Sequence, residues 1–279
     1  MQYVNYNGKL LSTGEAIISA SSRGLRYGDG LFETIRYSNG QLIMANEHFA
    51  RLWKGMQVLS FKPSKHFTPE KLEEDILALI QKNGHHKGAR VRLMICRGDG
   101  GLFDAVNHIP NYIIETAPLP EGNGQWNSNG LVLGIYPVVK KSCDILANLK
   151  HNNYLPYVMA AMHAKAEKWN DAILLNTSGS ICDSCIANIF IIHNDIVLTP
   201  PLDDGCVAGV MREHVLQQLQ KLGYVVTERS LTTADLFLAD EVFLTNSVYN
   251  IRWVQQIGDK EYSNTLTQKI YNDLLPTIF

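Results

Sequence analysis

Lys150 is the first candidate for chemistry in this sequence, and it stands in the segment ILANLKHNNYLPY. The apolar residues and Asn148 before it indicate a chain leaving a strand, and Asn153-Tyr154 after it opens a predicted helix. Lys150 is therefore expected at a strand-to-helix turn, and such turns can present a side chain to a site. A solvated surface lysine is the alternative, since most lysines are exposed.

The second candidate is an anion site in the segment PPLDDGCVAGVMREHVLQQLQKLG. A loop that contains Gly205 and Gly209 runs there into a helix predicted at 210–222, which Gly223 ends. The free N–H groups and the dipole of a helix N-terminus favour a bound anion such as phosphate. An ordinary turn before an ordinary helix is the alternative interpretation.

Two charged residues could complete such a site. Arg51 lies beside the apolar stripe of a predicted helix, and a guanidinium can bind phosphate through two hydrogen bonds. Asp183 lies between a turn and a strand in GSICDSCIANIF. The alternatives are an ion-paired or solvated arginine and a solvent-facing turn aspartate.

The first half of the chain holds elements that can position these residues. Alternation around Asn7-Gly8 predicts an antiparallel hairpin. From Glu47 to Ser60, apolar residues recur at spacings of three and four, as in an amphipathic helix. A second helix is predicted from Pro69 to Asn83, because Thr68 is a suitable N-cap and Gly84 a suitable stop. The segments ARVRLMICRG and NYIIETAPL are predicted to be strands.

The stretch PLPEGNGQWNSNG is nearly devoid of apolar residues and rich in Pro, Gly and Asn, which is typical of a connection between domains. It predicts a first domain at 1–116, a linker at 117–130 and a second domain at 131–279. Beyond it, LVLGIYPVV, DAILLN, ANIFIIHNDIVL and EVFLTNS read as strands, and NNYLPYVMAAMHAKAEKW reads as a helix. Strands and helices in both halves indicate two α/β (α+β) domains.

Composition excludes several classes of function. A formal net charge of −2 without a basic stripe argues against a nucleic-acid partner. No signal peptide or run of about 18 apolar residues is present, so a soluble, cytoplasmic protein without membrane contact is expected. Five cysteines suit a reducing compartment. We interpret the Cys182-Cys185 spacing as accidental, give His85-His86 no functional weight and expect no metal site.

Six blocks in this order resemble the class IV aminotransferases, a family that includes branched-chain and D-amino-acid aminotransferases and aminodeoxychorismate lyases. The blocks span nearly the whole chain, so that chance agreement is improbable. They are SSRGLRYGDGLFETIR at 21–36, EHFARL at 47–52, KHNNY at 150–154, DSCIANIF at 183–190, GVMR at 209–212 and FLTNS at 243–247.

The resemblance implies a fold type IV enzyme with pyridoxal 5′-phosphate at a domain interface, and a homodimer. Lys150 would form the Schiff base and later act as the general base. The cofactor phosphate would be bound by Arg51, the backbone of Val210 and Met211, Asn246 and Ser247. Asp183 would contact the ring nitrogen. Tyr154 would lie near the phenolic oxygen. The family usually has Glu where this chain has Asp183, which implies a small shift of cofactor or backbone. We expect the glycine pair of GDG at 28–30 to shape a turn that brings Phe32, Glu33 and Arg36 toward the site.

Within the family the reaction stays open. Transamination between an amino acid and a 2-oxo acid requires a group that binds the substrate α-carboxylate, and Arg97 resembles such a position, with Phe32 and Arg36 as further substrate contacts. A strand-end arginine without this role is the alternative. Thr34 differs from the Gly typical of branched-chain enzymes, whereas the FET pattern and Ala187-Asn188 resemble aminodeoxychorismate lyases, which release pyruvate and 4-aminobenzoate. We favour the aminotransferase slightly over the lyase, and both over a cofactor-binding protein without turnover.

Overall fold

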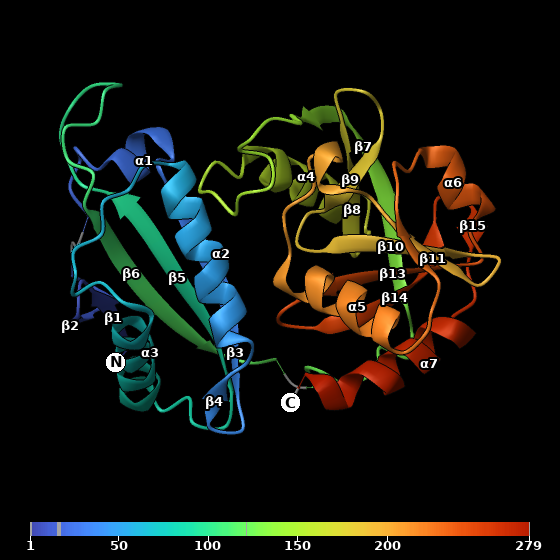
Figure 1. Cartoon of the computed structure of the whole chain (residues 1–279), viewed down its shortest axis with the longest axis horizontal. Coiled ribbons are helices and arrows are strands. Elements are labelled where there is room, and N and C mark those ends of the chain that lie inside the picture. The colour runs from blue at the N-terminus through green and yellow to red at the C-terminus, as the bar shows by residue number, and fades with distance from the viewer. Residues whose placement is uncertain (1, 16–17, 121, 279) are drawn as a thin grey trace. The chain divides into compact units, whose positions relative to one another are not determined.

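The computed structural model of the chain describes residues 2–15, 18–120 and 122–278. It divides into two compact units (Figure 1). Unit 1 comprises Met1–Asn123 and Lys150–Asn153, and unit 2 comprises Gly124–Leu149 and Tyr154–Phe279. The first division point falls inside the linker expected at 117–130. The return of four residues around Lys150 to unit 1 has no counterpart in the sequence prediction.

Unit 1 is built on an antiparallel sheet that has six strands in the described part of the chain, in the order β2-β1-β6-β5-β3-β4. Its first two strands form the hairpin expected around Asn7-Gly8. The elements are β1 (Tyr3–Tyr6), β2 (Lys9–Ser12), α1 (Arg23–Tyr27), β3 (Gly30–Ser38), β4 (Gln41–Leu42), α2 (Ala45–Val58), α3 (Pro69–Asn83), β5 (Ala89–Arg97) and β6 (Pro110–Pro118).

The two long helices of unit 1 begin and end close to the predicted residues. The Thr68 side chain accepts a hydrogen bond from the Lys71 amide at 3.2 Å, and Gly84 ends α3 with a φ of 72°. Helix α2 buries Phe49, Leu52 and Met56, three members of the expected apolar stripe. Burial of this stripe against the sheet stabilises α2, because the apolar area leaves water.

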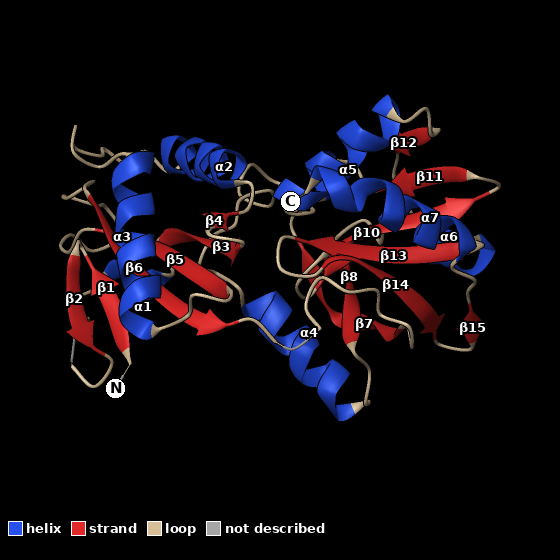
Figure 2. Cartoon of the chain, turned by 90° about the horizontal axis from the view of Figure 1, so that it is seen from below, coloured by secondary structure: helices blue, strands red, loops and turns tan. Residues whose placement is uncertain are grey.

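Unit 2 contains a mixed sheet that has nine strands in the described residues, eight of them in the order β12-β11-β10-β13-β14-β7-β8-β9, with β15 paired to β14. Figure 2 shows α4 against one face of this sheet and α5 and α7 against the other. The elements are β7 (Leu131–Lys141), α4 (Leu155–Ala166), β8 (Asp171–Asn176), β9 (Ile181–Ser184), β10 (Asn188–His193), β11 (Ile196–Thr199), η1 (Leu202–Asp204), α5 (Val210–Lys221), β12 (Val226–Glu228), α6 (Thr233–Leu238), β13 (Glu241–Asn246), β14 (Asn250–Ile257), β15 (Lys260–Glu261), α7 (Thr265–Leu274) and η2 (Leu275–Thr277).

Strands β8, β9, β10 and β13 of unit 2 are almost wholly buried, since helices cover both faces of the sheet. Every residue of β8 and of β9 is buried, which explains the apolar run Ala172–Leu175 in β8. Helix α4 starts at Leu155, three residues later than the predicted segment, and holds Pro156 in its first turn, where no intrahelical N–H bond is lost. Among the described residues, no helix is long and apolar enough to cross a membrane.

Candidate active site

Lys150 lies against strand β3 of unit 1. Its carbonyl accepts a hydrogen bond from the Phe32 amide at 2.8 Å, and the Asn152 amide donates to Gly30 O at 3.0 Å. A β-bridge between Leu31 and His151 lies between these two bonds. The lysine segment therefore pairs with the end of β3 like a short extra strand, which fixes the backbone from which the amine projects.

The glycines of GDG allow this close approach. A Cβ on Gly28 would collide with the Asn153 side chain, and a Cβ on Gly30 would collide with Ile95 O and the Asn152 amide group. Gly28 also has a φ of 63°, a left-handed conformation that glycine adopts at little cost. The expected turn is present, but the two glycines serve mainly to seat the lysine segment on the sheet.

One face of strand β3 gathers the aromatic and basic residues near Lys150. Lys150 Nζ lies 4.6 Å from the centroid of the Phe32 ring, and the guanidinium carbon of Arg92 lies 4.1 Å from the same centroid. Arg36 shares this face with Phe32, because alternate residues of a strand point the same way. The sequence prediction missed Arg92, although the alternation in ARVRLMICRG could have placed it on the less buried face of its strand.

Arg51 is held by a buried carboxylate on the other face of β3. Its Nε donates to Glu33 Oε1 at 2.8 Å and its Nη2 to Glu33 Oε2. His48 Nδ1 lies 2.7 Å from the same Glu33 Oε2. Burial alone would raise the pKa of Glu33, but Arg51 and His48 bring it down to about 2, so the carboxylate is charged at neutral pH. Burial lowers the pKa of His48, and its bond to Glu33 offsets this only partly.

The pair with Glu33 thus orients Arg51. Glu33 was expected to approach the site itself. Instead it aims the arginine, together with His48, a residue that the sequence prediction did not single out. The EHFARL spacing could have indicated it, since His48 and Arg51 are three residues apart on one helix face.

Arg97 makes a dense set of contacts within unit 1. Its Nε lies 2.9 Å from Asp29 Oδ2, its Nη1 lies 3.0 Å from His108 Nδ1, and its Nη2 donates to Leu59 O. The guanidinium also covers the Phe61 ring at 4.3 Å. These contacts favour the alternative interpretation of Arg97, in which it joins loops of unit 1, over recognition of a substrate carboxylate.

In unit 2, Asp183 on β9 is the centre of a buried polar cluster. Its carboxylate accepts hydrogen bonds from Lys141 Nζ, from the Tyr157 hydroxyl and from the Val207 amide, at distances between 3.0 and 3.3 Å. Tyr154, the N-cap residue of α4, stacks on Tyr157 with the ring centroids 4.3 Å apart. The turn-aspartate alternative is wrong, because Asp183 is only 2% exposed.

Lys141 and Tyr157 are the two members of this cluster that the sequence prediction missed. Lys141 is the last residue of β7 and, unlike its neighbour Lys140, it is buried. Alternation along VVKK could have placed one of the two lysines inside. Nothing in the sequence indicated that this lysine would meet a carboxylate 42 residues away.

The N-terminus of α5 provides the expected cradle of backbone groups in unit 2. No side chain caps it, and its N-cap residue is Gly209. A Cβ on Gly209 would collide with Asn188 Oδ1, and the Asn188 amide in turn donates to Val207 O at 2.8 Å. The first turn contains Val210 and Met211, whose N–H groups point along the helix axis as in other helix N-termini. This arrangement suits a phosphate.

Asn246 and Ser247 lie at the turn after β13. The Asn246 side-chain oxygen accepts from the Val248 and Tyr249 amides at 3.0 and 2.8 Å, and its NH₂ group donates to Ile186 O at 3.3 Å. Asn246 therefore shapes the turn with its side chain. A role for this turn in anion binding would fall more naturally to Ser247.

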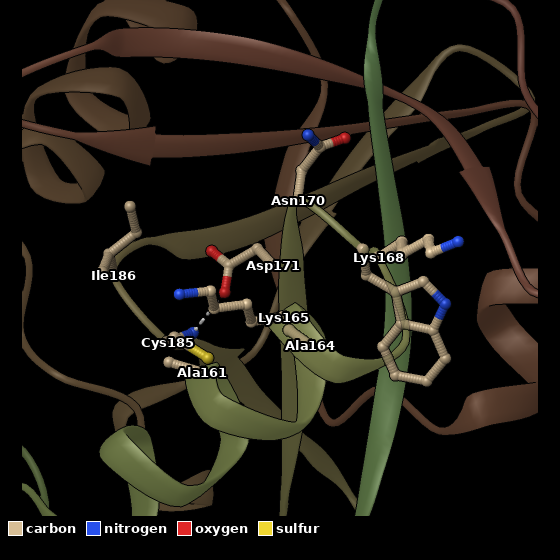
Figure 3. A pocket seen from close by; sticks show the side chains of 9 residues that line it. Ala161, Ala164, Lys165, Lys168, Asn170, Asp171, Cys185 and Ile186 are labelled. Atoms are coloured by element: carbon tan, nitrogen blue, oxygen red, sulfur yellow. Dashed lines mark hydrogen bonds between the residues drawn. The ribbon is translucent and has the colours of Figure 1, made fainter.

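A cavity of about 370 Å³ beside α4 contains none of the predicted site residues (Figure 3). The carboxylate of Asp171 faces it but is bound by Ser184 Oγ at 2.8 Å and by the Cys185 and Ala172 amides at 3.0 and 2.8 Å. Asp171 thus ties β8 to the end of β9. The remaining lining residues are Ala161, Ala164, Lys165, Lys168, Trp169, Asn170 and Ile186.

The two cysteines of the CxxC segment are buried as free thiols. Burial raises the pKa of both Cys182 and Cys185 far above its ordinary value, so neither is reactive at neutral pH. The described residues hold no group of three or more His, Cys, Asp or Glu side chains that could bind a metal ion.

Comparison with known proteins identifies the family. Residues 30–257 match the family described as Amino-transferase class IV. A putative branched-chain-amino-acid aminotransferase of Methanocaldococcus jannaschii is 30% identical over 271 residues, which cover 96% of this chain and 92% of that protein. An aminodeoxychorismate lyase of Vibrio harveyi is also 30% identical, over 246 residues that cover 88% and 89% of the two chains.

A solved structure shows the same fold. The branched-chain aminotransferase of Thermoproteus uzoniensis, crystallised with norvaline, superposes with a TM-score of 0.86 at 26% identity, over 98% of this chain and 94% of that one. The expected two-domain fold is thereby confirmed. With the family match over most of its length, this chain belongs to the class IV aminotransferases, a family of pyridoxal-phosphate-dependent aminotransferases and lyases.

Proposed function

We propose that this chain is a pyridoxal-phosphate-dependent aminotransferase that moves an amino group between an amino acid and a 2-oxo acid, with Lys150 as the covalent anchor of the cofactor. The observation that carries the proposal is the seating of Lys150 on β3, where two backbone hydrogen bonds and two glycines hold its segment. An ordinary surface lysine needs no such support.

The donor set of the chain fits the cofactor. An uncapped helix N-terminus at α5 and the guanidinium of Arg51 offer the N–H groups that a phosphate requires. Ser247 and Asn246 would complete the phosphate site. Asp183 offers an anionic oxygen to a ring nitrogen, and Tyr154 would lie near the phenolic oxygen. When bound, the cofactor supplies an electron sink for the bond that breaks at the substrate Cα.

The roles of the protein residues follow from these positions. Lys150 would hold the cofactor, and its Nζ, once free, would accept the proton from the substrate Cα. Asp183 would keep the ring nitrogen protonated. Arg51 and the α5 N-terminus would hold the phosphate, so that the reacting carbon stays within reach of Nζ.

Substrate recognition would fall to the face of β3 and β5 that carries Phe32, Arg36 and Arg92. Arg92 and Lys150 both contact the Phe32 ring. Arg92 is therefore a better candidate than Arg97 for binding the substrate carboxylate. Arg97 remains the weaker alternative, since its guanidinium is engaged by Asp29, His108 and Leu59.

The second candidate function is the lyase that converts aminodeoxychorismate to pyruvate and 4-aminobenzoate. It is supported by the similarity to the Vibrio harveyi lyase, which equals the similarity to the Methanocaldococcus protein in percent identity. The greater length of chain covered by the latter favours the aminotransferase. Both activities use the same lysine and ring partner, so the site residues above do not separate them.

A panel of substrates tests the proposal. We expect purified protein with pyridoxal phosphate and 2-oxoglutarate to form 2-oxo acids from branched-chain L-amino acids, measured by chromatography. D-alanine tests the D-specific alternative, and aminodeoxychorismate tests the lyase through pyruvate plus 4-aminobenzoate. If 4-aminobenzoate is released and no amino acid of the panel yields its 2-oxo acid, the protein is a lyase and the proposed aminotransferase activity is wrong. Cofactor binding without any product would instead identify a binding protein.

We also propose a homodimer, and the outer face of α4 supports it. Four apolar side chains of this helix are exposed, namely Leu155, Val158, Met159 and Met162 at 73%, 47%, 44% and 63%. A helix with apolar residues all round is typical of one that is covered on every side. A second copy of this chain would cover this face in a symmetric dimer.

We expect sedimentation to give a dimer at micromolar concentration, and the double variant Val158→Asp/Met162→Asp to dissociate it by at least about tenfold in Kd, because two charges would be buried. Lys165→Asp, an exposed position on the same helix, is the matched control. A fully active wild-type monomer would contradict the dimer.

A further inference from the structure

The Asp183 carboxylate accepts four hydrogen bonds from groups of unit 2 in the absence of any cofactor. Its Oδ2 accepts three hydrogen bonds, from Lys141 Nζ at 3.1 Å, from the Tyr157 hydroxyl at 3.1 Å and from the Val207 amide at 3.0 Å. Its Oδ1 accepts one longer bond, from Lys141 Nζ at 3.3 Å. Among the residues that the structure describes, Oδ1 accepts only this longer bond and is therefore the less engaged of the two carboxylate oxygens, with room for a further donor.

The charges in this cluster balance within unit 2. Lys141 and Asp183 are both buried and form an ion pair, and Lys141 Nζ also donates to the Tyr157 hydroxyl. Burial raises the pKa of Tyr157 well above its ordinary value, so the hydroxyl stays protonated. Burial likewise raises the pKa of the neighbouring thiols of Cys182 and Cys206. Lys141 is therefore the cation that neutralises the Asp183 carboxylate in the cluster.

A buried ion that loses its partner is costly, because neither water nor an opposite charge compensates it. A carboxylate that waits for a cofactor is in this situation whenever the cofactor is absent. The side chain of aspartate is also one methylene shorter than that of the usual glutamate, and it must be held at a defined place to reach the ring. Lys141, Tyr157 and the Val207 amide together restrict it to one orientation.

We propose that Lys141 is a positioning residue that holds the Asp183 carboxylate in one orientation before the cofactor binds, and that Asp183 would then also accept a hydrogen bond from the ring nitrogen of the cofactor. Only the contact between Asp183 and the cofactor rests on the proposed function. The ion pair between Lys141 and Asp183 is present in the protein without cofactor.

The cofactor ring and Lys141 would then each be able to provide a partner for the Asp183 carboxylate. In the Lys141→Met variant, the cofactor-free protein retains a buried carboxylate without its cation, whereas the loaded protein has the ring nitrogen as a partner. The substitution should therefore destabilise the cofactor-free form more than the loaded form. By linkage, the variant should bind the cofactor about tenfold more tightly than the wild type does.

The experiment measures thermal melting of both forms for wild type, Lys141→Met, Asp183→Asn and the double variant. We expect cofactor-free Lys141→Met to melt about 5–10 °C below wild type, with pyridoxal phosphate recovering most of the difference. The double variant should melt higher than the Lys141→Met single variant, because both partners are then neutral. Lys140→Met, at the exposed neighbouring lysine, is the matched control and should have little effect.

A cofactor analogue separates the two halves of the inference. With 1-deazapyridoxal 5′-phosphate, which has C–H in place of the ring nitrogen, Lys141→Met should show no preferential recovery. Two results would mean that Lys141 contributes only packing. One is an equal loss of melting temperature in Lys141→Met with and without pyridoxal phosphate. The other is an equal recovery of melting temperature by pyridoxal phosphate and by its 1-deaza analogue. If Lys141→Met does not fold, Lys141→Arg must retain the wild-type melting temperature, and failure of this rescue would overturn the charge argument.

Failure of the proposed function would look different. Wild-type protein would then form no visible band with pyridoxal phosphate, and the cofactor half of the inference would fall with it. The cofactor-free melting cycle would still report whether Lys141 and Asp183 are coupled, and additive effects of the two substitutions would overturn that half.

Discussion

Replacing Lys150 by alanine is expected to remove the visible absorption band of the lysine-bound cofactor, at about 410–430 nm, and to slow turnover by at least about 10³-fold. Two losses add up in this variant. The cofactor loses its covalent attachment, and the substrate Cα loses the amine that accepts its proton. Because the segment is fixed through its backbone, Lys150→Ala should keep the fold, and its melting temperature should stay close to that of the wild type.

The measurement is an absorption spectrum after dialysis against an amine, followed by borohydride reduction and peptide mapping. The reduced cofactor should be found on Lys150 in wild type and on no lysine in the variant. Lys140→Ala, an exposed lysine in unit 2, should keep band and turnover. A reducible band that persists in Lys150→Ala and maps to another lysine, such as Lys141, would refute the assignment.

Asp183→Asn is expected to slow Cα deprotonation by about 10²-fold or more, which corresponds to roughly 3 kcal/mol, while cofactor content stays close to wild type. Asparagine has nearly the volume of aspartate but cannot stabilise a protonated ring nitrogen. The phosphate contacts lie elsewhere, so retention should change little. The measurement is single-turnover kinetics with saturating cofactor, together with cofactor content after gel filtration.

Asp183→Asn also leaves the Lys141 ammonium without its carboxylate, so the cofactor-free variant should lose stability. Saturating cofactor separates this effect from the chemical one. A wild-type rate for Asp183→Asn under these conditions would mean that Asp183 is not the ring partner.

Substitution of Arg51 is the comparison for Asp183→Asn, because it is expected to weaken cofactor retention instead of slowing the chemical step. Alanine is a poor choice here, since it would leave the Glu33 carboxylate buried without its cation and destabilise unit 1 by about 3–5 kcal/mol. Arg51→Lys keeps the charge beside Glu33 but loses the geometry for two hydrogen bonds to phosphate. It should weaken cofactor retention and slow the chemistry mainly when cofactor is limiting.

Much of the local structure followed from the sequence alone. The stripe of Phe49, Leu52 and Met56 predicts α2, and the Thr68 cap and Gly84 stop predict α3, because helix periodicity and capping depend on neighbouring residues. The family and its candidate lysine could also be predicted, since six sequence blocks in order resemble the class IV aminotransferases. The polar composition of 117–130 predicts a linker, and the division after Asn123 lies within that stretch.

The partners of the charged residues were decided by the tertiary structure only. Lys141 meets Asp183 from 42 positions away, Arg51 meets Glu33 on a neighbouring strand, and Arg97 is engaged by Asp29. Such pairs depend on which strand ends come together and on how fully water is excluded there. Neither property is encoded in local spacing, because a buried ion pair is stabilised by groups that the fold brings together from distant parts of the chain.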